Sequence, residues 1–130
     1  MGGGIFDDAD VISRYTRAQA IREGTLIDVT AAAREHGIKY PVAITVMAHR
    51  TCVALTPAAE RAGNDLTGRL CDVLTMLVHG IRRNRDKSEF SFTVCCVVDE
   101  IEAEDVELRA VAGGGDNGEP VVTVMLDWED

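Results

Sequence analysis

The sequence predicts a single α+β domain, in which a C-terminal three-stranded antiparallel meander packs against one long amphipathic helix after short N-terminal helices. Two observations predict this class. An apolar stripe at helical spacing runs through residues 65–83, and three segments with alternating apolar residues follow it. The length of 130 residues fits one domain, 1–130, and the hydrophobic fraction of 46% is sufficient for a core.

The N-terminal part is predicted to begin with a short helix and a short strand. Thr16 and Gln19 have the spacing of a capping box, in which each side chain satisfies a backbone N–H at the start of a helix. Gly24 is a suitable residue to end that helix. Residues 25–29 are rich in apolar and β-branched side chains, so they are a candidate fourth strand of the sheet.

The middle of the chain contains one segment that fits two structures. Thr30 is expected to cap a second short helix over residues 31–36. In residues 42–55 the β-branched side chains favour a strand, whereas the spacing of several apolar positions fits a helix from about Pro41. We favour the helix slightly and leave the strand open. Thr56-Pro57 is typical of a cap followed by proline at the first helical position.

The second half is predicted to form the long helix and the meander. The helix over 65–83 carries one apolar stripe, made of Leu66, Leu70, Val73, Leu74, Leu77, Val78 and Ile81. Strands are predicted at 89–98, 105–112 and 120–128, each with apolar residues on one face. Asn117-Gly118 indicates a hairpin turn. The simplest topology is an antiparallel meander whose apolar face is covered by the long helix.

Negative charge is concentrated at the C-terminal end. Residues 1–48 carry six acids and five bases, and residues 49–87 carry four acids and seven bases. Residues 88–130 carry twelve acids and one base, which is Arg109. The net charge of −9 therefore combines −1, +3 and −11 in three successive segments. Such a field repels nucleic acid from the acidic end and attracts basic surfaces to it.

Several classes of protein are disfavoured by the same residues. No apolar run approaches the length of a membrane span, and the N-terminus has neither the basic nor the apolar region of a signal peptide. The four cysteines form no C-x-x-C pair, so we expect buried free thiols in a reducing cytoplasm. With 5% aromatic residues, the strands lack the stacking platforms of an RNA-binding sheet.

Three motifs resemble functional sites, and each has a simpler structural interpretation. Asp72, Thr75 and His79 fall on one polar stripe of the long helix, where an Asp–His pair is a candidate general base. His49-x-x-Cys52 offers two metal ligands, but no further ligands complete a recognisable set. The glycine-rich run at 113–118 lacks the lysine and hydroxyl of a P-loop. We therefore expect neither a metal nor a cofactor.

Four segments resemble a family of small uncharacterised bacterial proteins that is often carried on plasmids and phages. They are Ile12–Ile21 with Gly24–Val29, Lys39–Ala43, Gly68-Arg69-Leu70 and Gly115–Val121. The resemblance covers nearly the whole chain and implies no catalytic residue. It does imply a context, because mobile elements often encode small acidic proteins that disarm host defence.

The resulting hypothesis is a non-enzymatic binding protein, an inhibitor of a nucleic-acid-handling defence system such as restriction or CRISPR machinery. It would bind a basic protein surface and contact neither nucleic acid nor membrane. The alternatives are an oligomerising module, for which a homodimer is the simplest form, and a small enzyme that uses Asp72 and His79 or an exposed thiol. The acids expected to contact the partner are Glu100, Glu102, Glu104, Asp105, Asp127, Glu129 and Asp130.

Overall fold

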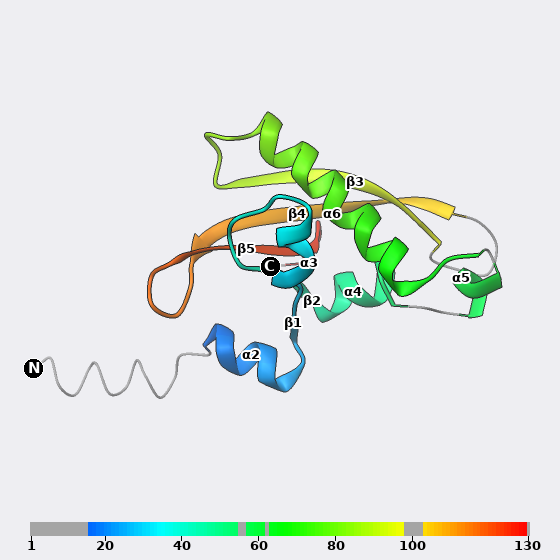
Figure 1. Cartoon of the computed structure of the whole chain (residues 1–130), viewed down its shortest axis with the longest axis horizontal. Helices are drawn as coiled ribbons and strands as arrows, with labels where there is room; N and C mark the ends of the chain where they lie inside the picture. Colours follow the sequence, from blue (N-terminus) through cyan, green and yellow to red (C-terminus); the bar gives the residue numbers. More distant parts are fainter. Residues whose placement is uncertain (1–15, 55–56, 62, 98–102, 130) are drawn as a thin grey trace, which may run out of the picture.

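A five-stranded mixed sheet organises the chain in the computed structural model, which describes residues 16–54, 57–61, 63–97 and 103–129 (Figure 1). The sheet has the strand order β1-β2-β5-β4-β3, with β2 and β5 parallel and the other neighbours antiparallel. In chain order the elements are α2 (Arg17–Glu23), β1 (Leu26–Asp28), α3 (Thr30–Glu35), β2 (Val42–Thr45), α4 (Val46–Cys52), α5 (Pro57–Arg61), α6 (Leu66–Arg83), β3 (Glu89–Val97), β4 (Ala103–Gly114) and β5 (Pro120–Leu126).

The predicted C-terminal meander is confirmed, but it is only part of the sheet. β3 pairs with β4 and β4 with β5, both antiparallel, and the β4–β5 turn contains Gly118 with a φ of 80°. Glycine adopts this left-handed conformation without steric cost. The candidate fourth strand at 25–29 is present as β1. It does not join the meander directly, because β2 lies between β1 and β5 and makes the sheet mixed.

The segment with two interpretations contains both structures. Residues Val42–Thr45 form β2, and α4 follows immediately. Thr45 separates them, because its backbone is extended and its side chain accepts a hydrogen bond from the Ala48 N–H at 3.2 Å. The preference for helix from Pro41 was therefore wrong for Pro41 and for Val42–Thr45. Val42 and Ile44 are fully buried and β2 pairs on both sides, so tertiary contacts decide the structure here.

The predicted caps of the two short N-terminal helices have different outcomes. Thr16 caps α2 in a complete capping box, and α2 ends at Gly24 as expected. The helix α3 begins at Thr30 itself, with Val29 in the cap position, so the predicted Thr30 cap was wrong. The Thr30 hydroxyl instead accepts a hydrogen bond from the Val42 N–H at 3.1 Å. It therefore ties the start of α3 to β2.

One face of the sheet is covered by α3, α4 and α6, and the core lies between them and the strands. Figure 1 shows α6 crossing β3 and β4. Each fully buried leucine or valine here contributes about 1.5–3 kcal/mol relative to an exposed one. The largest fully buried side chains are Ile44, Leu74, Leu77, Leu108, Val42, Val73, Val124 and Cys52.

The long helix matches its prediction closely. Asp65 caps α6 by accepting a hydrogen bond from the Gly68 N–H at 2.6 Å. Most of the predicted stripe faces the core, but Leu66 in the first turn is 51% exposed. Gly80 marks the closest approach of α6 to the sheet, since a Cβ atom there would lie 2.2 Å from the Phe90 ring. A glycine at this position lets the helix pack directly on β3.

A buried arginine joins α6 to the end of α4. Arg69 is 3% exposed, and its Nε donates to the Val53 carbonyl at 3.1 Å. Its Nη2 donates to the Thr51 carbonyl at 3.2 Å. These carbonyls belong to the last turn of α4, where a helix leaves acceptors unsatisfied. Arg69 is thus a structural cation, and it is one of the seven bases in the basic middle segment.

Within the described ranges, no helix combines the length and the apolar character that are needed to cross a membrane.

Candidate functional site: the acidic face

The second face of the sheet is covered only in part. α2 packs beside β1, and the Arg17 guanidinium reaches the Thr123 hydroxyl of β5 at 2.7 Å. Ala43 and Val121 are buried at this end of the face. On β3 and β4 the same face is exposed. We call the four exposed acids on this side of the sheet the acidic face: Glu89 of β3, Asp105 and Glu107 of β4, and Asp127 directly after β5.

Strand register explains why these carboxylates share a face. Side chains alternate across a strand, and residues directly opposite on paired strands point the same way. Asp105 lies opposite Cys95, and Glu107 lies opposite Thr93. The Thr93 hydroxyl donates to the Glu107 carboxylate at 3.2 Å. The residues of β3 and β4 that alternate with these point to the core, so one polar and one apolar face follow from the sequence pattern.

Arg109, the single base of the C-terminal third, lies in the middle of the acidic face. Its Nη1 atom is 3.0 Å from the Glu89 carboxylate, and both side chains are partly exposed to solvent. Its Nη2 atom donates to the Glu129 carbonyl and contacts the Met125 sulfur. Of the four carboxylates, Arg109 pairs with that of Glu89, so the acidic face keeps a net negative charge.

The acids predicted from the sequence do not form one cluster. Asp105 and Asp127 belong to the acidic face, and the Asp127 carboxylate accepts a hydrogen bond from the Ser91 hydroxyl at 2.9 Å. Glu104 lies opposite Cys96, so it points to the other side of the sheet. Glu100, Glu102 and Asp130 lie outside the described residues, and Glu129 turns back toward the protein.

The carboxylate of Glu129 supports the fold. It accepts hydrogen bonds from the Thr45 hydroxyl at 2.7 Å and from the Leu126 N–H at 2.8 Å. Thr45 is the residue that caps α4. Glu129 thus ties the end of β5 to the β2–α4 junction, and we leave it out of the acidic face.

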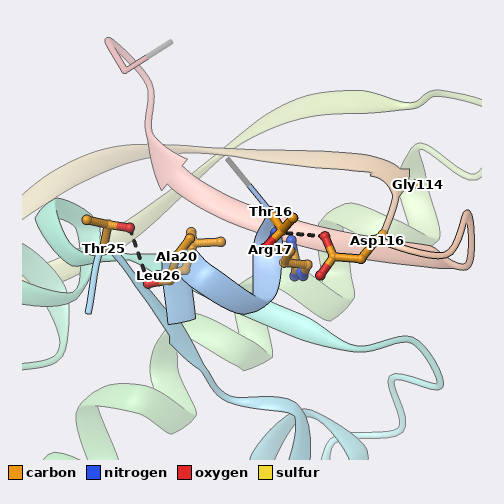
Figure 2. Close-up of a pocket in the computed structure, with 8 residues that line it drawn as sticks. Thr16, Arg17, Ala20, Thr25, Leu26, Gly114 and Asp116 are labelled. Carbon is orange, nitrogen blue, oxygen red and sulfur yellow. Dashed lines mark hydrogen bonds between the residues drawn. The ribbon is translucent and has the colours of Figure 1, made fainter. Parts of the chain in front are cut away.

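The glycine-rich hairpin loop lies against the start of α2 rather than around a phosphate. Figure 2 shows Asp116 beside Thr16 and Arg17 at a cavity of about 510 Å³. The Asp116 carboxylate accepts the backbone N–H groups of Arg17 at 2.8 Å and of Ala18 at 3.0 Å. Burial lowers the pKa of Arg17, and the carboxylates of Asp28 and Asp116 oppose that shift. Asp116 therefore takes the place that an anion would occupy at this helix start.

The two sequence motifs for catalysis or metal binding are not assembled. Asp72 and His79 are exposed on α6, and seven residues of helix separate them by about 10.5 Å, too far for a hydrogen bond. His49 and Cys52 lie on α4, where Cys52 is buried. The described part of the chain contains no group of three or more histidine, cysteine or acidic residues that could hold a metal ion.

The four cysteines separate into two environments. Cys52 and Cys96 are buried as predicted, whereas Cys71 and Cys95 are exposed, contrary to that prediction. A hydrogen bond between the two buried thiols, together with their desolvation, raises the pKa of Cys96. Cys95 and Cys96 point to opposite faces of β3, as expected for neighbours in a strand.

Sequence reasoning missed one pair of chemically active side chains. The Cys71 sulfur lies 3.2 Å from Nε2 of His36. The two residues are 35 positions apart and belong to different helical segments, so no spacing rule connects them. His36 is the C-terminal cap residue of α3, a position that by itself gives no indication of this contact.

Fold and surface together define a small α+β protein with a mixed five-stranded sheet, one covered face and one partly open acidic face. The chain belongs to the Family of unknown function (DUF6573), whose family model matches residues 3–130. This confirms the resemblance to an uncharacterised family over nearly the whole chain. No curated protein and no solved structure matches the chain.

Proposed function

We propose that this protein is a small non-enzymatic binding protein whose acidic face occupies a lysine- and arginine-rich surface of a nucleic-acid-handling protein, such as a restriction or CRISPR effector. The observation that carries the proposal is the open half of the sheet, where four exposed carboxylates share one face and Arg109 pairs with one of them, Glu89. Carboxylates spaced along adjacent strands present negative charges to a groove that otherwise holds phosphates. The expected partner is therefore defined by the positive charge of its surface.

Charge alone does not supply tight binding. Exposed ion pairs contribute only about 0–1 kcal/mol each. Their main effect is to steer association and to select the partner, and both effects weaken as salt increases. The affinity must come from additional contacts beside the carboxylates.

The outer edge of β3 offers such contacts. β3 is a nine-residue strand at the end of the sheet order, and its solvent-side residues from Glu89 to Cys95 adjoin the acidic face. An edge strand presents N–H and C=O groups to which an extended segment can pair. A basic segment that paired with β3 would place its arginine or lysine side chains beside Glu89 of β3, with Asp105 and Glu107 of β4 one strand further in. We therefore expect the partner to contribute an extended basic segment.

A defined peptide tests this mode of binding. The probe is a short extended peptide that alternates arginine with valine, and its association rate is measured at low and moderate salt. Neutralising the acidic face with D105N, E107Q and D127N is expected to slow association about tenfold at low salt and to flatten the salt dependence. The matched control carries E35Q, D72N and D86N, which remove the same charge from exposed positions elsewhere. Equal losses in both variants would contradict the proposal.

A second probe separates charge from strand pairing. The same peptide with alternate backbone amides N-methylated keeps its charges but cannot complete a ladder of hydrogen bonds. We expect its association rate to be nearly unchanged and its dissociation to be faster. If methylation had no effect on dissociation, the β3 edge would not be the contact. A third variant neutralises Glu100, Glu102 and Glu104 and measures how far the neighbouring acids add to the salt dependence.

A further inference from the structure

A cysteine–histidine pair lies on the side of the molecule formed by α3 and α6. Cys71 is exposed on α6, and His36 follows the last residue of α3. The Cys71 sulfur is 3.2 Å from Nε2 of His36, and Nδ1 of the same ring is 3.0 Å from the Ala32 carbonyl oxygen. Nucleophile, base and a group that orients the base are thus in hydrogen-bonding contact.

The Ala32 contact determines which ring nitrogen carries the proton. A carbonyl oxygen only accepts hydrogen bonds, so Nδ1 of His36 must donate, and in the neutral ring Nε2 is then unprotonated. Nε2 therefore faces the Cys71 thiol as an acceptor. Transfer of the thiol proton would give a thiolate beside an imidazolium, and the Ala32 carbonyl stabilises the positive ring. The thiolate is the nucleophilic form of cysteine.

A cation-lined groove leads away from His36. It has a volume of about 530 Å³ and runs between the segment after α3 and the C-terminal half of α6. Its lining residues include no acid, and its charged side chains are Lys39, Arg82 and Arg85. Its remaining wall includes Val78 and the half-exposed ring of Tyr40. The groove is thus suited to an anionic ligand with some apolar surface.

The length of α6 limits the size of that ligand. Cys71 and Arg82 are separated by eleven residues of helix, or about 16 Å. An extended peptide of roughly five residues spans this distance. A ligand that reaches both the thiol and the arginines must therefore be about the size of a small peptide.

We propose that Cys71 is a thiol-exchange site that forms a mixed disulfide with small acidic peptide disulfides. His36 takes the thiol proton, and the Cys71 thiolate attacks one sulfur of the peptide disulfide. The S–S bond of the peptide breaks, a new S–S bond forms to Cys71, and the leaving thiolate receives the proton from the His36 imidazolium. The peptide disulfide is the oxidant, and Cys71 is oxidised as the leaving half is reduced.

Thiol–disulfide exchange is the reaction that these groups are sufficient to perform. It requires a thiolate, a proton acceptor and access for the disulfide. Acyl transfer by the same pair would further require donors placed for a developing oxyanion. Two of the groove's cations, Arg82 and Arg85, instead lie at and just beyond the C-terminal end of α6, where they fit the terminal carboxylates of a bound peptide.

Cys95 provides a control within the same chain. It is also an exposed free thiol, but it lies beside Asp105 on the acidic face. An anionic reagent is repelled there and a cationic reagent is attracted. The other two cysteines, Cys52 and Cys96, are buried. One chain therefore presents two accessible thiols in opposite charge environments.

The experiment compares two disulfides on the full chain, with the modified cysteine identified by peptide mass spectrometry. The acidic probe is glutathione disulfide, and the basic probe is cystamine. We expect glutathione disulfide to modify Cys71 at least about tenfold faster than Cys95, because base and cations act together. Cystamine is expected to reduce or reverse this preference. Equal rates at the two thiols with both probes would overturn the proposal.

Two variants separate the base from the groove. H36Q is expected to slow modification of Cys71 by both probes and to leave Cys95 unchanged. R82Q with R85Q is expected to slow glutathione disulfide alone, whereas the matched control R22Q with R50Q should not, since those exposed arginines lie on α2 and α4. Circular dichroism confirms that each variant is folded. The proposal would also be overturned if H36Q left the rate of Cys71 modification unchanged. The same holds if R82Q with R85Q slowed glutathione disulfide and cystamine equally.

Discussion

The two faces of the sheet differ in the side chains that they carry and in what covers them. On the covered face, α3, α4 and α6 bury apolar side chains such as Leu74 and Leu108 completely. On the open half of the other face, neighbouring positions of the same strands carry carboxylates and hydroxyls that remain in water. Because strand side chains alternate, each strand contributes apolar side chains to the covered face and polar side chains to the other face.

This difference separates the face that packing stabilises from the face that we propose for recognition. The covered face holds the fold together through packing, so changes there are expected to lower the free energy of unfolding. The acidic face carries charge that packing does not need, so changes there should affect partners more than folding.

The largest expected effect comes from a pair of substitutions that shorten one side chain on each face. L74A removes a fully buried side chain from α6 and should lower the free energy of unfolding by about 2–5 kcal/mol. T93A removes an exposed hydroxyl from the acidic face and should change it by less than about 0.5 kcal/mol. Urea denaturation measures both values. Comparable losses in the two variants would show that the open face contributes to stability as the core does.

A smaller effect is expected where α6 touches the sheet. G80A places a methyl group against the Phe90 ring, and overpacking of this kind costs about 1–3 kcal/mol. The gain in helix propensity, about 1 kcal/mol, offsets part of that cost. We therefore expect a net loss of up to about 2 kcal/mol, measured by urea denaturation.

Two further variants identify the cause of that loss. Adding F90L to G80A should recover part of it, because a shorter side chain leaves room for the methyl group. G68A is the matched control in the same helix, where the nearest atom is the end of the exposed Asp65 side chain. If G80A and G68A had equal effects, close packing on β3 would not be the reason for Gly80.

Local patterns predict much of the fold, and pairing between distant segments accounts for the rest. The α6 stripe, the three alternating strands and the Thr16 capping box act within a few residues, and each is observed where the sequence places it. The strand β2 and its parallel pairing with β5 depend on residues about eighty positions apart. No local rule decides between helix and strand for Val42–Thr45, because burial between two strands supplies the answer.

The candidate sites also divide into features that local sequence patterns predict and features that depend on contacts between distant segments. Segment charge indicates an acidic end, and alternation along the strands then accounts for the acidic face. The sequence groups Glu104 with Asp105, but the pleat places them on opposite sides of the sheet. The pair His36 and Cys71 is brought together only by the packing of α3 beside α6, and the buried role of Arg69 depends on the end of α4. Both are contacts between segments.

The smallest expected effect is a change in how stability falls at low pH, and it is assigned to His49 on α4, one of the helices of the covered face. Burial lowers the pKa of His49 on α4 from its ordinary value of 6.5, so the folded state binds this proton less readily than the unfolded chain. The neutral ring is favoured in the fold, and the associated stability is present above pH 6.5 and is lost as pH falls below it toward the folded pKa. H49Q should therefore reduce the loss of stability between pH 7 and pH 5. This change in the free energy of unfolding is expected to be smaller than the changes in L74A and G80A. H79Q, at an exposed position on α6, is the matched control. An unchanged slope in H49Q would place the acid sensitivity elsewhere.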